Sequence, residues 1–154
     1  MSLRIIAEHA RTMTVMVTDG VRPSNQERGY VLRRIIRRAV RHAYTLGARD
    51  VVMPAMVDAV VASMGSAYPE LAAAHAVVRK VIEREEVAFR ATLARGVEML
   101  DGIVARGDIS GEDAFFLHDT LGFPIDLTRE VAEERGRGID LDAFAERMAE
   151  QRAR

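Results

Sequence analysis

The stretch Ser24–His42, SNQERGYVLRRIIRRAVRH, has the pattern of one amphipathic helix, and a capping box of Ser24 and Glu27 predicts that the helix begins near Ser24. Apolar residues recur every three or four positions and so share one face: Leu32, Ile35, Ile36, Ala39, Val40 and Ala43. Five arginines share the opposite arc: Arg33, Arg34, Arg37, Arg38 and Arg41. We expect the apolar face to be buried and the guanidinium groups to face outward, where they can bind the phosphates of a nucleic acid.

A charged arc opposite an apolar face is also typical of an ordinary solvated helix. Two features favour anion binding over that alternative. No acidic residue lies four positions from any of the five arginines, so the helix alone leaves their charge uncompensated. Lys80 is the only lysine of the chain, and arginine is the residue suited to forked contacts with phosphate. A GC-rich genome would produce the same preference for arginine.

The composition is that of a globular protein with 154 residues, 49% of them hydrophobic, no cysteine and a net charge of −1. The charge is unevenly distributed along the chain. Residues 21–50 contain eight arginines and two acids, a net +6, whereas residues 119–150 contain nine acids and four arginines, a net −5. This asymmetry indicates either a basic binding face or two halves that attract each other. The lack of cysteine, signal peptide and long apolar run predicts a cytoplasmic protein without a membrane span.

The remaining sequence also has helical periodicity, and no segment shows the two-residue alternation of a strand. The predicted helices are 3–18, 51–64, a long rod over 69–106, 112–118 with Ser110 as its cap, one capped by Asp126 or Thr128, and 140–154 with Leu141, Phe144 and Met148 inward. Residues 119–124 are predicted to form a compact turn. The fold class is therefore an all-α, multi-helix bundle with one long central helix. It is a single domain, with possible subdomains 1–106 and 107–154.

Familiar catalytic motifs are absent from the sequence. There is no P-loop, no G-x-G-x-x-G and no nucleophile elbow, and the four histidines are scattered, so a metal site is not expected. Three acids, Glu83, Glu85 and Glu86, alternate with basic residues on the long rod. We interpret them as ion pairs on the surface of that helix. The chain by itself has no recognisable catalytic centre.

Two long stretches together resemble signatures of the alanyl-tRNA synthetases: DGVRPSNQERGYVLRRIIRRAVRH at 19–42 and AFFLHDTLGFPIDLTREVAEERG at 114–136. Their order and separation match, FAERMAEQRAR at 144–154 is also similar, and the resemblance extends over 4–154. It implies the helical tRNA-recognition domain that follows the class II aminoacylation domain and holds the acceptor stem of tRNA(Ala). The class II motifs and the editing domain have no counterpart, so the resemblance implies a fragment inactive alone. Its partners would be that stem and the parent chain's catalytic domain, with ATP, magnesium and zinc bound only by the full-length enzyme.

The resemblance also implies roles for individual residues. Asn25 falls on the Asn of the family's P-S-N motif, and Asp119 falls on the Asp of its D-T-x-G-F-P motif. In the family this pair reads the G·U wobble pair at the third step of the acceptor stem. The chain departs from the family at His118 and Leu121, where tyrosine is common. Both departures flank Asp119, so local packing there is expected to differ.

The chemistry of such a readout is plausible on physical grounds. A wobble pair leaves the exocyclic amine of G without a partner in the minor groove, which is wide and shallow in A-form RNA. Oxygens of Asn25 and Asp119 could accept from that amine, for about 1–3 kcal/mol of discrimination. The five arginines would hold the backbone. Without the resemblance, Asn25 would be interpreted as a helix-start residue and Asp119 as a turn former.

Two other functions stay open. The first is a helical protein-interaction module that docks through the rod at 71–104 and binds acidic protein with its arginines. The second is a stand-alone enzyme, which the missing motifs disfavour.

Overall fold

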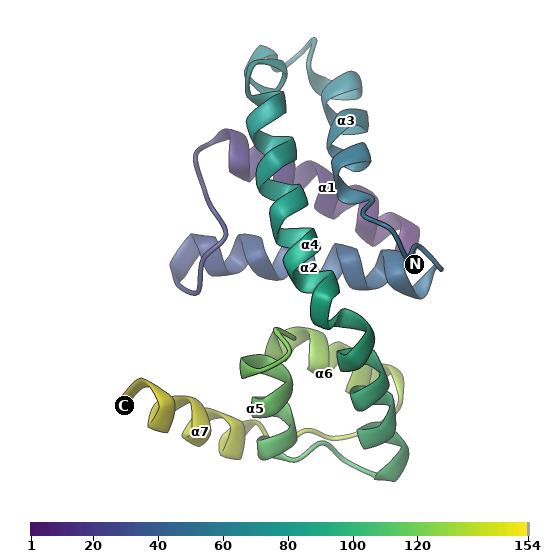
Figure 1. The fold of residues 1–154 in the computed structure, drawn as a ribbon, viewed down its shortest axis with the longest axis vertical. Helices are drawn as coiled ribbons and strands as arrows, with labels where there is room; N and C mark the ends of the chain where they lie inside the picture. The colour runs from purple at the N-terminus through teal and green to yellow at the C-terminus, as the bar shows by residue number, and fades with distance from the viewer. Residues whose placement is uncertain (154) are drawn as a thin grey trace. The chain divides into compact units, whose positions relative to one another are not determined.

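The computed structural model describes residues 1–153, which form seven α-helices and no strand (Figure 1). The helices are α1 (Ser2–Thr18), α2 (Glu27–Thr45), α3 (Met53–Met64), α4 (Pro69–Arg106), α5 (Gly111–Asp119), α6 (Ile125–Glu134) and α7 (Leu141–Ala153). The all-α class and the long helix are thus confirmed. None of the described helices is both long enough and apolar enough to cross a bilayer. The chain divides into two compact units, Met1–Arg90 and Ala91–Arg154, and the division falls within α4.

In the first unit, α1 packs along α2 and α3 also contacts α1. The apolar face of α2 is buried as its periodicity predicts, except that Ile35 is only half-buried. The core is completed by side chains of the other helices of this unit: Met13, Val57, Val78, Ile82 and Phe89, each at most 1% exposed. Burial of such aliphatic and aromatic groups contributes about 1.5–3 kcal/mol per side chain.

In the second unit, the C-terminal part of α4 packs against the turn that joins α5 to α6. Phe123, fully buried, lies against Gly96 of α4, where a Cβ atom would come within 2.8 Å of Phe123 Cδ2. The Thr92 hydroxyl donates to the Leu121 carbonyl across 2.7 Å. An isolated parallel bridge between Ile109 and Ile139 joins the loop before α5 to the loop before α7.

The helix starts in the second unit agree only in part with the sequence. The predicted cap of α5 is confirmed, because Ser110 Oγ accepts from the Asp113 amide at 3.0 Å. The predicted cap of α6 is wrong: its N-cap residue is Pro124, which leaves Asp126 and Thr128 inside the helix.

The inward face predicted for the last helix is also wrong. No residue of α7 is buried, Leu141 is 40% exposed, and Phe144 and Met148 are only half-buried. The physical reason is that α7 rests mainly on α5, so that one neighbour covers only part of its surface.

Candidate nucleic-acid interface

The five arginines of α2 do not face outward, so that prediction is wrong. Arg41 is buried, and the side chains of Arg33 and Arg37 retain only 23% and 16% of their exposure. Arg34 and Arg38 are half-buried, and Arg38 Nη1 lies 3.3 Å from His9 Nε2 of α1. The arc opposite the apolar stripe is covered because α1 and α4 both contribute side chains to it.

A carboxylate of α4 holds two of these arginines. Glu85 Oε1 lies 3.0 Å from Arg33 Nε, 2.8 Å from Arg37 Nε and 2.7 Å from Arg37 Nη2. The Arg37 guanidinium also lies 5.2 Å from the centre of the Phe89 ring, a cation–π contact. Burial lowers the pKa of Arg37, and the charge of Glu85 opposes that shift. The compensating acid therefore comes from a residue 48 and 52 positions further along the chain.

Glu86 is likewise an internal residue and not a surface one. It is fully buried, and its carboxylate accepts from the amides of Val52 and Met53, the latter at 2.7 Å. Arg90 Nε donates to the same carboxylate at 2.8 Å. The surface interpretation of Glu85 and Glu86 was thus wrong. One signal in the sequence could have revealed it, because both acids interrupt the apolar stripe of the rod between Ile82 and Phe89.

The loop that carries Asn25 has a fixed backbone. The α2 helix begins at Glu27, not near Ser24, and the predicted capping box does not form: the Ser24 hydroxyl donates to the Gln26 carbonyl at 2.9 Å instead. The Ser24 amide donates to the Gly29 carbonyl at 3.1 Å. Glu27 has φ +47°, in the left-handed region that side chains rarely adopt. Such strain persists only where surrounding contacts impose it, and it is frequent at binding sites.

The exposed side chain of Asn25 is held by one of the half-buried arginines. Its Oδ1 accepts from Arg33 Nη1, the same guanidinium that binds Glu85. The other side-chain atom, Nδ2, makes no hydrogen bond within residues 1–153. Asn25 therefore presents its amide donor to solvent, while Arg33 occupies one of the two lone pairs of its oxygen.

Asp119 is the last residue of α5 and is exposed at the start of a tight turn. The predicted turn is confirmed: Gly122 has φ +69°, and the Phe123 amide donates to the Leu117 carbonyl at 2.9 Å. The Asp119 carboxylate accepts from the side-chain amide of Gln151 in α7.

The two residues that depart from the resembled motif pack within the second unit. The His118 ring meets Phe144 edge to face at 5.5 Å, and Leu121 is 2% exposed.

Of the predicted site residues, Asn25, Arg33 and Arg37 are joined in the first unit, Asn25 to Arg33 and both arginines to Glu85. Asp119 belongs to the second unit.

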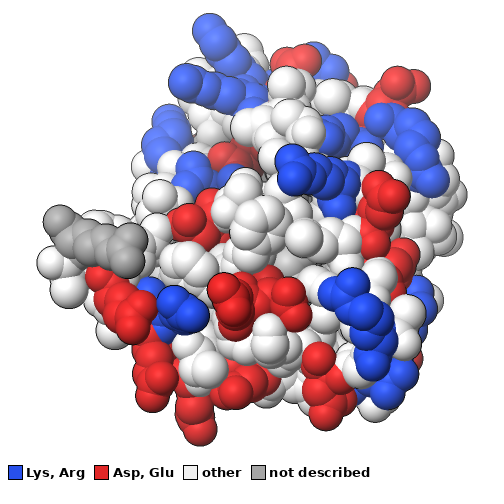
Figure 2. All heavy atoms as spheres, turned by 60° about the horizontal axis from the view of Figure 1, so that its bottom comes forward, with Lys and Arg blue, Asp and Glu red and all other residues white. Residues whose placement is uncertain are grey.

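The two units carry opposite charge. The first has fourteen basic and nine acidic residues, a net +5, and the second has eight basic and fourteen acidic residues, a net −6. Figure 2 shows one face of the molecule, on which acidic side chains gather toward the lower edge. Among residues 1–153, no cluster of three or more histidines and carboxylates is placed to hold a metal ion.

Comparison with known proteins gives a consistent result. The sequence profile of the family described as "tRNA synthetases class II (A)" matches residues 1–154. The chain is 49% identical over 98% of its length to the alanine–tRNA ligase of Paracoccus denitrificans and 50% identical over 98% to that of Jannaschia sp.. It is 52% identical over 99% of its length to the alanine–tRNA ligase of Psychrobacter sp.. It spans 18%, 18% and 17% of the lengths of these relatives.

Proposed function

The chain belongs to the alanyl-tRNA synthetases, within the family tRNA synthetases class II (A), and from this premise we propose that it holds the acceptor stem of tRNA(Ala) and reads its G·U wobble pair. ATP-dependent alanylation would be the work of the full-length enzyme, whose catalytic domain would be the other partner and would bind ATP and magnesium. The observation that carries the proposal is the presentation of Asn25, which is exposed on the loop before the left-handed Glu27 at the start of α2 and is held by Arg33.

The chemistry of the two proposed reading residues supports different contributions to the readout. Asp119 is an acceptor, so it takes the exposed amine of the wobble guanine. In the free chain Asp119 accepts a similar hydrogen bond from Gln151, in which an NH₂ group also donates to the carboxylate. Asn25 Oδ1 accepts from Arg33 and keeps a second lone pair for the same amine, while its Nδ2 can donate to a carbonyl or ribose hydroxyl oxygen of the same step.

Arg28, which was not among the predicted arginines, is the residue best placed to bind a phosphate directly. Arg28 is exposed in the first turn of α2, and its guanidinium makes no hydrogen bond or ion pair within residues 1–153. The amino end of a helix adds favourable potential for an anion at this point. The five largely covered arginines, of which Arg41 is buried and the other four are half-buried, supply additional positive potential.

The test is a titration of this chain with two RNA hairpins that differ only in the third pair of the stem, G·U or G·C. Asn25→Ala and Asp119→Ala should each reduce the preference for G·U by about fivefold or more, with a small loss of total affinity. Glu83→Gln, an exposed change on α4, serves as the control for loss of a charge. Equal affinity of the unchanged chain for both hairpins would refute the proposal.

A protein-interaction module is the alternative that the surface of α4 supports. Val77 and Val87, both on α4, are 50% and 53% exposed and would be available to a partner. Part of the rod at 71–104, the predicted docking surface, is unavailable to a partner, because Leu71, Val78 and Leu93 are at most 2% exposed. Under this alternative, Val87→Ser would leave RNA binding unchanged, and neither hairpin would bind in a salt-dependent manner.

A further inference from the structure

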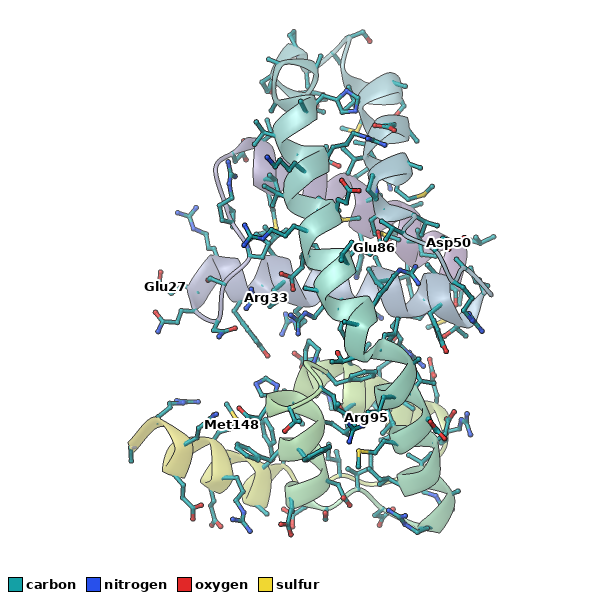
Figure 3. The ribbon with its side chains drawn as sticks, viewed as in Figure 1. Glu27, Arg33, Asp50, Glu86, Arg95 and Met148 are labelled. Atoms are coloured by element: carbon teal, nitrogen blue, oxygen red, sulfur yellow. The ribbon has the colours of Figure 1, made fainter. Side chains whose placement is uncertain are left out.

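We propose that Glu85, a buried carboxylate of α4, positions the RNA-reading side chain of Asn25 through Arg33 and thereby helps to determine specificity. The inference rests on the proposed function for its consequence in RNA binding, but not for the link between the three side chains. Arg33 lies on α2 and Glu85 on α4, and their side chains meet between the two helices. In Figure 3, Arg33 and Glu86, the residue next to Glu85, are labelled.

The link depends on the shape of one guanidinium group. Arg33 uses Nε toward Glu85, at 3.0 Å, and Nη1 toward Asn25 Oδ1. These nitrogens belong to one rigid plane, so the bond to Glu85 sets the direction in which Nη1 points. The orientation of the Asn25 amide, and with it the direction of the free Nδ2 donor, follows from the position of a carboxylate on another helix.

Glu85 is needed because Arg33 lies one helical turn from Arg37. Guanidinium groups at this spacing repel each other, and both are largely removed from water, with 23% and 16% of their side-chain surface exposed. Glu85 Oε1 lies between them and accepts from both. Without that charge, Arg33 would extend toward solvent and release Asn25.

The arrangement exceeds what packing alone requires. Arg37 already satisfies the buried carboxylate with two nitrogens, at 2.8 and 2.7 Å, and is fixed from its other side by Phe89. Arg33 adds a connection that leads outward, from the buried carboxylate to an exposed side chain on the loop. A positioning role explains why the more exposed arginine is included.

Two variants test the link in different ways. Glu85→Gln removes the charge but keeps an acceptor of the same size. Arg33→Lys keeps a positive charge beside Glu85 and leaves Arg37 untouched, but an ammonium group lacks the planar fork that spans both partners. Glu83→Gln, on the exposed side of the same helix, is the matched control.

Three measurements are made on each variant: thermal unfolding, the affinities for the G·U and G·C hairpins, and the side-chain amide resonances of Asn25 in ¹⁵N-labelled protein. We expect both test variants to move the Asn25 amide resonances. We also expect the preference for G·U to fall by about fivefold or more, and affinity for the G·C hairpin to change by no more than about twofold. The control should behave as the unchanged chain in all three. A merely structural role of Glu85 would lower the unfolding temperature and leave both the resonances and the preference unchanged.

The outcomes separate the two proposals. If the unchanged chain does not distinguish the hairpins, the proposed function fails, and the Asn25 resonances still decide whether Glu85 holds Asn25. If the chain does distinguish them but Arg33→Lys keeps both the preference and the resonances, the positioning role is overturned. Should Glu85→Gln prevent folding, Arg33→Lys alone gives the decision, because it retains the ion pair between Glu85 and Arg37.

Discussion

Gly29 illustrates how one residue can fix the position of a neighbouring loop. A Cβ atom at this position would lie 2.5 Å from the Arg22 carbonyl oxygen and closer still to the Ser24 hydroxyl. The loop that presents Asn25 therefore lies directly on the backbone of α2. A glycine is unfavourable inside a helix, by about 1 kcal/mol relative to alanine, so its presence here has a packing reason.

Gly29→Ala should accordingly act against helix propensity. We expect the loop to be displaced, stability to fall by about 1–3 kcal/mol as in other overpacked sites, and the preference for G·U to be lost. Urea unfolding and the two-hairpin titration measure these effects. Gly102→Ala is the matched control, because nothing lies within 4 Å of its Cβ position, and it should be neutral or stabilising. If the two alanine variants behaved alike, close packing of the loop on Gly29 would be refuted.

At the scale of elements, α3 is attached to α4 by a charge inside the first unit. The start of α3 has no side-chain cap of its own, and Glu86 supplies one by accepting from the amides of Val52 and Met53. Arg90 neutralises this carboxylate and also donates to the Ala48 and Arg49 carbonyls at 3.0 and 3.2 Å. Thus one ion pair joins α4 both to the first turn of α3 and to the loop before it.

Glu86→Gln should destabilise the first unit by about 2–4 kcal/mol. The largely buried Arg90 guanidinium would lose its charge partner, and the amides at the start of α3 would lose a charged acceptor. Chemical denaturation monitored by circular dichroism measures the change. Glu83→Gln, three residues earlier and exposed, should change stability by less than about 0.5 kcal/mol. A similar small effect of both variants would show that Glu86 does not hold α3.

At the scale of the whole molecule, the opposite charges of the two units bear on RNA binding. Most of the positive charge available to a polyanion belongs to the first unit, net +5, whereas Asp119, the proposed acceptor for the guanine amine, belongs to the acidic second unit. A carboxylate near RNA is repelled by phosphates, so contacts from basic residues must offset that repulsion. Association should therefore depend strongly on salt.

We expect the affinity for either hairpin to fall as the salt concentration rises. Arg28→Gln should weaken the binding of both hairpins alike. It should also reduce the slope of log affinity against log salt concentration by about 1, the value for one lost phosphate contact. Fluorescence anisotropy at increasing KCl concentration measures both slopes. Arg37→Ala would not be a clean probe of backbone contact, because Arg37 also binds Glu85 and contacts the Phe89 ring. A slope that did not change with Arg28→Gln would exclude Arg28 as a phosphate ligand.

The sequence by itself determined the helices, their approximate ends and the family. Periodicity, Pro69 at the start of α4 and Ser110 before α5 are local signals, because helical hydrogen bonds and caps join residues three or four positions apart. The motifs around Asn25 and Asp119 identified the family, since each is a contiguous run of residues. The turn after α5 was predictable for the same reason: Gly122 and Pro124 restrict the backbone on the spot.

Only the tertiary structure decided where the charged side chains point. A helical pattern shows which face is apolar, but whether the opposite arc meets water or another helix depends on contacts between distant segments. Arg33 and Arg37 find their acid 52 and 48 residues away, and Glu86 finds its amides 34 and 33 residues away. The orientation of the Asn25 amide depends on the same contacts. Arg33 can donate to the Asn25 oxygen in this geometry only once α4 packs against α2 and Glu85 holds the guanidinium.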